Sequence, residues 1–384
     1  LGILDQQPAG ILVVDAAPLS HAMIRLLTLG IPTILISAEM AAHFDEGMDV
    51  FIDGYRGIII DRPETETETT VTPQPPPPGE AIKLEDDSDV LLCASIFSAD
   101  EAALAVEQGA AAVGLVRSEF LLPEDERLPD RAFYESTLQQ LCDAARPLAV
   151  TIRLPDIAAD KQVPWLEPTR GRGGPLGVQG VRLYHVDALK NVTGALLDAI
   201  NGLADNDRLR LLLPYVTSLD EFSYWRNEFE SRLGRSLPIG VMAESPVAVL
   251  TMPHWFDVAD FVAIGCNDLM QCLFAADRDL VDVSSHLDPY SPELFRFLKQ
   301  AADAAGDNIH QVQLCGLLSQ IPGVMPVLLG IGYRRFSVSP VMIPYLGKAV
   351  SEISLSRVEQ LAQQVCAAKK SAQVRDLLEN ILAV

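Results

Sequence analysis

The sequence predicts an α/β protein whose larger part is a TIM (β/α)8 barrel, preceded by part of a smaller α/β domain. Two observations predict this architecture. An acidic, proline-rich segment divides the chain, and beyond it eight short apolar runs alternate with helical stretches through residues 81–384. Eight successive β–α units are what a TIM barrel requires. An open, doubly wound sheet is the alternative that alternation alone leaves open.

Residues 1–62 form the smaller part. Apolar runs near residues 10–16, 32–37, 49–54 and 56–61 predict strands, and a helical pattern starting near Ser20 ends at Gly30. The chain begins almost at once with a strand and without an initiator methionine, so we expect a fragment of a longer polypeptide. Residues 63–80 alternate acidic residues with threonine and then carry four consecutive prolines, a composition typical of a linker.

Residues 81–384 contain the eight runs that predict the barrel strands. They span residues 89–96, 111–120, 148–157, 208–216, 239–246, 260–269, 311–318 and 334–340. Helical patterns such as SADEAALAVEQG separate them.

Charge and cysteine usage limit the classes of partner and compartment. The net charge of −23 argues against nucleic acid or an anionic membrane as a partner, because both need a basic surface. No apolar run approaches the ~20 residues that cross a bilayer. The six cysteines are scattered and none forms a CxxC pair, which favours a reducing compartment, the cytoplasm by default.

Polar residues gather where the predicted strands end, and that end of a TIM barrel carries the chemistry. These residues are Arg117, Glu119, Arg153, Asp156, Glu244, Asn267, Asp268 and Cys315, with Arg278 shortly after the sixth run. Glu244 and Asp268 could share one Mg²⁺, which takes one or two carboxylates plus substrate oxygens and waters. The three arginines could hold a phosphate or carboxylate by bidentate contacts.

Each of these residues taken alone has a structural explanation, since a charged residue at a strand end is more often a solvated rim residue or half of a salt bridge. Cys315 alone fits a small core residue. Their joint occurrence at several strand ends favours a site for a metal-bound phosphorylated acid. His21 follows a strand at or near a helix start, where free N–H groups favour an anion, although a lone histidine there is ordinarily a cap or surface residue.

Several segments resemble the phosphoenolpyruvate-utilising enzymes over nearly the whole chain. GLVRSEF is similar to the family's GLLRTEF-type segment, TIRLPDIAADK to its RTMDIGGDK-type segment, and VMAESPVA to its metal-binding glutamate segment. IGCNDLMQCLFAADR resembles IGTNDLTQYTLAVDR, which points to enzyme I of the bacterial sugar phosphotransferase system. QLCGLL stands at the family's CGE-type cysteine motif, and SHAMIRLLTLGIP at its phosphohistidine signature.

The resemblance implies a mechanism and a set of partners. Residues 1–62 would be part of a phosphohistidine (swivelling) domain and residues 81–384 the phosphoenolpyruvate-binding barrel. Phosphoenolpyruvate would bind through Mg²⁺ on Glu244 and Asp268, with four polar residues around its phosphate and carboxylate: Arg117, Arg153, Asn267 and Arg278. His21 would take the phosphoryl group, Cys315 would protonate the enolate to give pyruvate, and a histidine-containing phosphocarrier protein or fused carrier domain would receive the phosphate. The family also implies a homodimer through the barrel.

The chain departs from the family pattern at three places. AAPLSH replaces a GGRTSH-type lead into the histidine, Gln179 stands where the family has arginine, and Leu317 where it has glutamate, whereas Arg182 is retained. These departures support a second hypothesis from another class, a regulatory or sensor relative that binds phosphoenolpyruvate with weak turnover. A kinase-type relative that phosphorylates pyruvate with ATP is a third, which the sequence disfavours because no ATP-grasp region is recognisable in it.

Overall fold

The computed structural model describes most of the chain and divides it into two compact units. The described residues are 8–18, 20, 23, 26, 30–54, 57–61, 73–123, 125–157, 163–166, 176–203 and 206–382. The smaller unit comprises Leu1–Gln74 with Ala276–Asp288, and the larger one Pro75–Ala275 with Pro289–Val384. None of the described helices is long and apolar enough to cross a membrane.

The smaller unit contains two pairs of short strands. The elements are β1 (Ile11–Val14), β2 (Thr33–Ile36), α2 (Ala38–Ala41), β3 (Val50–Asp53), β4 (Ile58–Asp61) and, from the later segment, α10 (Val281–Ser284). β1 pairs with β2 in parallel, and β3 pairs with β4 antiparallel. The four strands lie where the sequence predicts them. His21, most of the helix predicted before Gly30, and residues 63–72 of the predicted linker lie outside the described residues.

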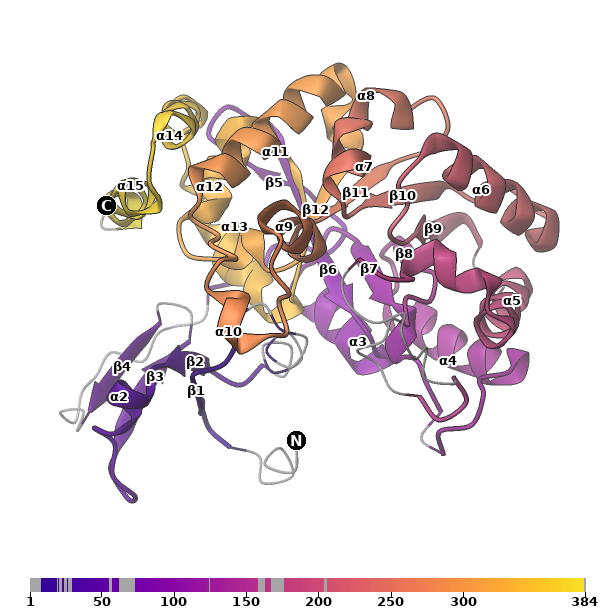
Figure 1. The fold of residues 1–384 in the computed structure, drawn as a ribbon, viewed down its shortest axis with the longest axis horizontal. Coiled ribbons are helices and arrows are strands. Elements are labelled where there is room, and N and C mark those ends of the chain that lie inside the picture. The colour runs from indigo at the N-terminus through magenta and orange to yellow at the C-terminus, as the bar shows by residue number, and fades with distance from the viewer. Residues whose placement is uncertain are drawn as a thin grey trace. The chain divides into compact units, whose positions relative to one another are not determined.

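The larger unit is a closed barrel of eight parallel strands, as predicted (Figure 1). The strands are β6 (Asp89–Ile96), β7 (Val113–Arg117), β8 (Val150–Arg153), β9 (Leu209–Leu213), β10 (Ile239–Ala243), β11 (Val262–Gly265), β12 (Val312–Cys315) and β13 (Arg335–Val338). Each pairs with its neighbour in sequence, and β13 closes the barrel against β6 with Phe336 opposite Leu92. This closure excludes the open doubly wound sheet. A two-residue strand outside the eight predicted runs, β5 (Ile82–Lys83), pairs antiparallel with the start of β6.

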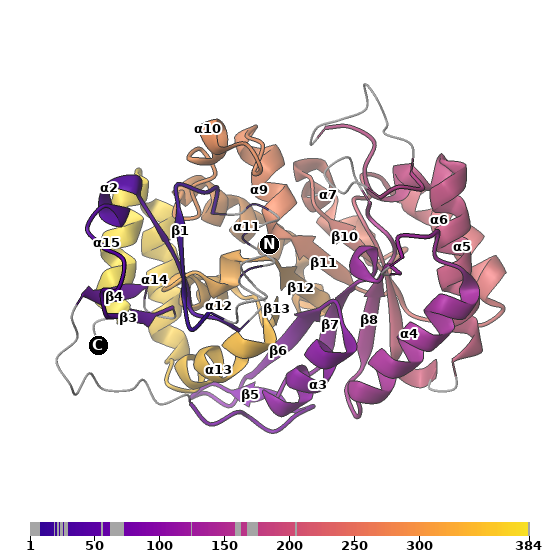
Figure 2. The ribbon, with the colours of Figure 1, turned by 90° about the horizontal axis from the view of Figure 1, so that it is seen from below.

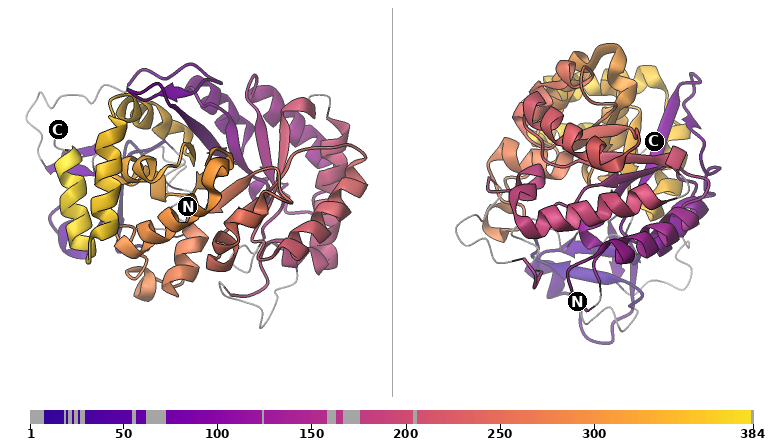
Figure 3. Two further views of the ribbon diagram at one scale, coloured as in Figure 1. Left: turned by 90° about the horizontal axis from the view of Figure 1, so that it is seen from above. Right: turned by 90° about the vertical axis from the view of Figure 1, so that its right-hand side faces the viewer.

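Helices lie outside the barrel strands (Figures 2 and 3). They are α3 (Ala99–Glu107), α4 (Arg131–Ala144), α5 (Asp187–Gly202), α6 (Leu219–Leu233), α7 (Pro246–Leu250), α8 (Met252–Trp255), α9 (Cys266–Phe274), α11 (Pro292–Ala305), α12 (Val324–Ile331), α13 (Ile343–Ser351), α14 (Leu355–Ala367) and α15 (Ser371–Leu382). Ser98 and Ser218 cap α3 and α6 by accepting the backbone N–H three residues on, a group with no partner inside the helix.

Alternate residues of the strands face the barrel interior, because successive side chains of a strand point to opposite faces. One interior cluster contains Leu115, Leu212, Met242, Phe261, Ala263 and Cys315. Gly114 allows the neighbouring strands to pack closely in the interior, since a Cβ there would lie only 2.7 Å from both Cys93 Cβ and Gln313 Oε1. The polar residues that follow the strands therefore lie next to a packed core inside the barrel.

Candidate active site

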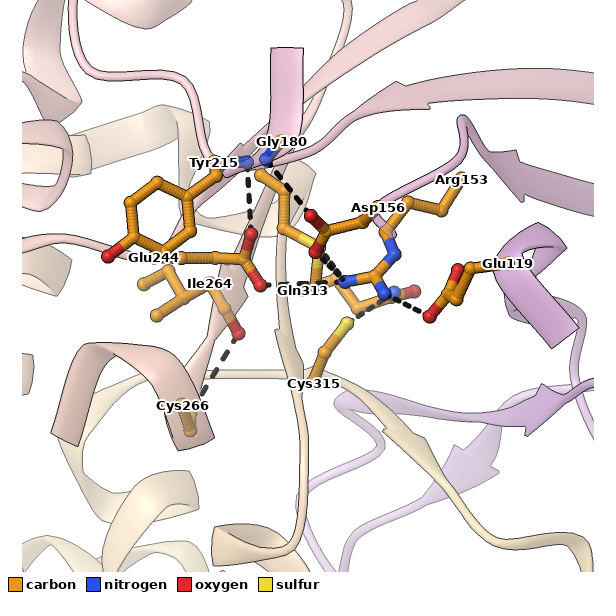
Figure 4. A network of polar contacts seen from close by, with 11 residues as sticks. Glu119, Arg153, Asp156, Gly180, Tyr215, Glu244, Ile264, Cys266, Gln313 and Cys315 are labelled. Carbon is orange, nitrogen blue, oxygen red and sulfur yellow. Dashed lines mark hydrogen bonds and ion pairs between the residues drawn. The ribbon is translucent and has the colours of Figure 1, made fainter. Parts of the chain in front are cut away.

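Arg153, the last residue of β8, lies at the centre of a buried network of charges at the C-terminal end of the barrel (Figure 4). Its side chain is 8% exposed, and its guanidinium pairs with Glu119, with Asp156 at 3.5 Å and with Glu244 at 3.6 Å. Burial lowers the pKa of Arg153, but the three carboxylates outweigh burial and raise it above its ordinary value. The guanidinium is thus a fixed positive charge at the strand ends.

Glu244 follows β10 directly and is almost completely buried. Its Oε2 accepts a hydrogen bond from the backbone N–H of Tyr215 at 3.0 Å. Burial, and next the charge of Asp268, raise the pKa of Glu244 well above its ordinary value. Gly265 makes room for this carboxylate, because a Cβ there would lie 2.5 Å from Glu244 Oε1.

Asn267 and Asp268 lie in the first turn of α9, which begins directly after β11. The positive end of the helix dipole favours the Asp268 carboxylate at this position. The Asn267 side-chain oxygen accepts a hydrogen bond from the Leu317 N–H at 3.1 Å, on the neighbouring strand's loop. Gly316 has a φ of +106°, and a Cβ there would lie 2.7 Å from the same oxygen, so this loop conformation favours glycine.

Two carboxylates therefore meet in this site, one buried and one partly exposed. Among the described residues, no group of three or more His, Cys, Asp and Glu side chains could hold a metal ion. Glu244 and Asp268 nevertheless suit Mg²⁺, because that ion commonly takes one or two carboxylates and completes its shell with waters and substrate oxygens. Burial and next the charge of Asp268 raise the pKa of Glu244, and a cation between the two carboxylates would relieve the repulsive part of this effect.

Cys315 ends β12 and is the register partner of Gly265. Its Sγ accepts a hydrogen bond from Gln313 Nε2 at 3.1 Å, and the same amide donates to Gly114 O at 3.1 Å. Burial raises the pKa of the Cys315 thiol to about 12. The side chain therefore carries its proton at neutral pH.

Arg117 is the register partner of Arg153 on the adjacent strand β7. Its charge acts on two neighbours, since it lowers the pKa of both Cys315 and Glu101 against the larger, opposite effect of burial. Arg117 therefore adds a second positive charge at this end of the barrel.

Asp156 links the network to the 3₁₀ turn Gly180–His185. Its Oδ1 accepts the Gly180 N–H at 3.0 Å, while Oδ2 faces Arg153. Gly180 has a φ of +54°, and a Cβ there would lie 2.4 Å from Pro214 O, so the turn requires glycine. Gln179 directly precedes this turn and lies one residue from the Asp156 contact.

Arg182 points to a different group of residues. Its Nη2 donates to Thr217 Oγ1 at 2.9 Å, and its Nε lies 3.5 Å from Glu221 Oε1, at the start of α6. The arginine that the sequence retains in this turn thus contacts Thr217, just before α6, and Glu221 in its first turn, and none of these contacts joins it to the Arg153 network.

The barrel brings most of the predicted residues to one end. Arg117, Arg153, Glu244, Asn267, Asp268 and Cys315 all end a strand or follow one. Arg278 belongs to the segment that groups with the smaller unit, and His21 lies outside the described residues. Sequence reasoning assigned no role to Gln313, although a polar residue two positions before Cys315 in an apolar strand marks the same interior face.

Comparisons with known proteins identify the family to which the chain is similar. Residues 79–355 match the family described as PEP-utilising enzyme, PEP-binding domain. A phosphoenolpyruvate-protein phosphotransferase of Haloferax volcanii is 30% identical over 390 residues, which cover 97% of this chain and 68% of that protein. A Salmonella typhimurium protein named phosphoenolpyruvate-dependent phosphotransferase system is 30% identical over 96% of this chain and 52% of its own length. A multiphosphoryl transfer protein of Xanthomonas campestris is 30% identical over 96% of this chain and 46% of its own length. The chain thus spans about half the length of these two bacterial relatives.

Proposed function

This chain belongs to the phosphoenolpyruvate-utilising enzymes, and from that premise we propose that it transfers the phosphoryl group of phosphoenolpyruvate to His21 and releases pyruvate. A histidine-containing phosphocarrier protein, or a carrier domain of the same polypeptide, then receives the phosphate. The observation that carries this proposal is the buried Arg153, which faces the Glu244 carboxylate at the C-terminal end of the barrel. A homodimer through the barrel remains a prediction from the family.

Substrate binding is proposed to use the charges of that end. Glu244 and Asp268 would hold Mg²⁺, which when bound supplies neutralisation of the phosphate charge. Arg117 and Arg153 would contact the phosphate or carboxylate of the substrate, with Asn267 as a neutral donor. Arg278 is proposed as a further phosphate contact. In phosphoryl transfer the protein contributes mainly such positioning and charge neutralisation.

The proposed reaction has two chemical steps. A ring nitrogen of His21 attacks phosphorus in line, the new P–N bond forms, and the P–O bond to the enol oxygen breaks with its electron pair. The methylene carbon of the resulting enolate then takes the Cys315 proton, which gives pyruvate, and the thiolate regains a proton from solvent. The pKa of Cys315, raised to about 12 by burial, supports this role because the thiol is protonated when the enolate forms.

A specific observation favours a second function, a phosphoenolpyruvate-binding regulatory protein with weak turnover. Gln179 carries no charge where the family has arginine, and Arg182 is engaged by Thr217 and Glu221. The charge missing at Gln179 is therefore not replaced by the nearest arginine in the sequence.

Labelled phosphoenolpyruvate tests the proposal. The chain is incubated with phosphoenolpyruvate carrying a radioactive phosphorus and Mg²⁺, and the protein-bound label is assayed for the acid lability of phosphohistidine. Label that disappears in His21→Ala, while calorimetric binding of phosphoenolpyruvate persists, supports the transferase. Binding without label in wild type supports the regulatory function. If the wild type neither binds phosphoenolpyruvate nor takes up the label, both functions are contradicted.

A further inference from the structure

A pair of arginines lies at the opposite, N-terminal end of the barrel, away from the charged network described above. Arg210 lies near the start of β9 and Arg335 begins β13. Each is two residues before an interior position: Leu212 belongs to the interior cluster, and Ser337 Oγ would lie 3.0 Å from a Cβ on interior Gly114. Both arginines therefore face the barrel axis, because residues two apart on a strand share a face.

The contacts of Arg210 confirm this direction. Its guanidinium carbon lies 4.9 Å from the centre of the Phe261 ring, and that ring covers Gly240, where a Cβ would come within 2.4 Å of it. Burial lowers the pKa of Arg210, and the positive charge of Arg335 lowers it further. The two guanidinium groups are thus near enough to repel each other.

The described residues do not compensate this positive charge. Nε of Arg335 is buried and has no hydrogen-bond partner among the described residues. Asp260 is the acidic group that acts on Arg210, but its Oδ2 already accepts from Ile239 N at 2.7 Å and pairs with Arg226 Nη2 at 3.1 Å. Two partly buried cations that face one another repel, and an anion between them would relieve that repulsion.

Two neighbouring arginines show the contrast. Arg334, one residue before Arg335, donates to Leu329 O at 2.7 Å and to Tyr333 O at 2.9 Å. Arg208, two residues before Arg210, donates to the backbone carbonyls of Leu148 and Cys142. These two arginines therefore have protein acceptors, whereas Arg210 and Arg335 have none among the described residues.

We propose that Arg210 and Arg335 form a binding site for a small dianionic oxyanion, a phosphate or a dicarboxylate, at the N-terminal end of the barrel. Guanidinium groups suit this ligand because their planar donors match two oxygens of one anion. The site is separate from the proposed phosphoenolpyruvate site and uses none of its residues. In a chain of net charge −23, it offers a local positive centre for a regulatory or stabilising anion.

Calorimetric titration with inorganic phosphate tests the site, and a parallel titration with malonate distinguishes a phosphate from a dicarboxylate ligand. Both are run with chloride at matched ionic strength and without Mg²⁺ or phosphoenolpyruvate, because the other site is proposed to bind its ligand through Mg²⁺. We expect Arg335→Gln and Arg210→Gln each to weaken anion binding at least ~10-fold, the loss expected for a charge-assisted hydrogen bond. Arg334→Gln removes the same charge next to the site and should bind as wild type does.

Thermal unfolding gives a second readout that does not depend on calorimetry. Arg335→Gln should melt at or above the wild-type temperature without anion, because one repelling charge is gone, and should lose the rise in melting temperature that phosphate or malonate gives to wild type. The proposal would be overturned if neither anion bound to the wild type. It would also be overturned if both glutamine variants bound the anions as tightly as the wild type. Phosphoenolpyruvate binding should be unchanged in Arg335→Gln, so failure of this site is distinguishable from failure of the proposed function.

Discussion

Nη1 of Arg153 lies 3.6 Å from Oε1 of Glu244, with both side chains almost completely removed from solvent. The pair joins the end of β8 to the residue after β10, and β9 lies between these strands. Because Glu119 and Asp156 also pair with Arg153, one guanidinium is the shared partner of three carboxylates. The stability of this end of the barrel and its ability to bind an anionic substrate therefore depend on the same side chain.

Removing the Arg153 charge should destabilise the fold. Arg153→Met leaves Glu119 and Glu244 buried without their cation, and breaking a buried pair in this way costs ~3–5 kcal/mol. Urea unfolding of wild type and variant measures the difference in the free energy of unfolding. Arg232→Met is the matched control, since Arg232 pairs with Asp198 at 2.7 Å on the surface, where such a pair contributes ~0–1 kcal/mol. Equal losses in the two variants would contradict the central role of Arg153.

The carboxylate pair should determine Mg²⁺-dependent binding. Glu244→Gln and Asp268→Asn preserve side-chain size, and each removes one of the two proposed carboxylate ligands of an ion that dehydrates reluctantly. We expect calorimetry to show no Mg²⁺-dependent binding of phosphoenolpyruvate to either variant. Asp198→Asn, on the surface, should bind normally. Wild-type affinity in both site variants would show that the metal does not bind here.

Gly265 should be required for binding while being dispensable for folding. A methyl group there would lie 2.5 Å from Glu244 Oε1, and the residue has a φ of −83°, so Gly265→Ala displaces the carboxylate without backbone strain. We expect the variant to lose Mg²⁺-dependent binding and to keep a cooperative melting transition. Gly234→Ala tests the opposite case, because its φ is +63° with nothing within 4 Å of the added carbon. That control should lose some stability and bind normally.

Glu101 should make stability depend on pH. Burial raises the pKa of Glu101 from 4.5 to about 7, although its carboxylate accepts the Phe97 N–H at 2.7 Å. A carboxyl whose pKa is higher in the folded state binds more protons there, so its contribution is present below pH 4.5 and is lost as pH rises towards 7. The loss is at most ~3 kcal/mol at 1.36 kcal/mol per pKa unit.

Urea unfolding at pH 5 and pH 8 measures this effect. We expect wild type to lose more stability between these two values than Glu101→Gln does, because the amide does not titrate. Glu107→Gln, an exposed position on the same helix, should behave as wild type does. An identical pH dependence in the wild type and Glu101→Gln would show that this carboxyl does not titrate abnormally.

Gln179→Arg should increase phosphorylation of His21. The new charge would stand one residue before Gly180, whose N–H binds Asp156, and Arg182 is held elsewhere. A charge-assisted contact contributes ~1.5–3 kcal/mol, so the rate of labelling from phosphoenolpyruvate should rise ~10-fold or more. No gain, together with undetectable wild-type labelling, would favour the regulatory function. Rapid labelling of the wild type would show that Gln179 does not impair phosphoryl transfer.

The sequence by itself determined the barrel and the end of it that carries the polar residues. Strand and helix periodicity are local properties, so eight apolar runs with helical stretches between them predicted β6 to β13. Parallel strands of one barrel also end on the same side, and this rule is enough to group Arg117, Glu244 and Cys315 from the sequence alone.

Only the tertiary structure decided which partner each side chain has. Arg153 meets three carboxylates, and Arg182 turns to Thr217, although both arginines belong to neighbouring segments of the sequence. Closure of β13 on β6 and the register of each strand pair determine such contacts, and both bring together residues that are far apart along the chain. Local sequence patterns therefore do not predict which of these distant residues come into contact. For the same reason, the space that Gly265 leaves for Glu244 and the inward pair of Arg210 and Arg335 could be recognised only in the folded barrel.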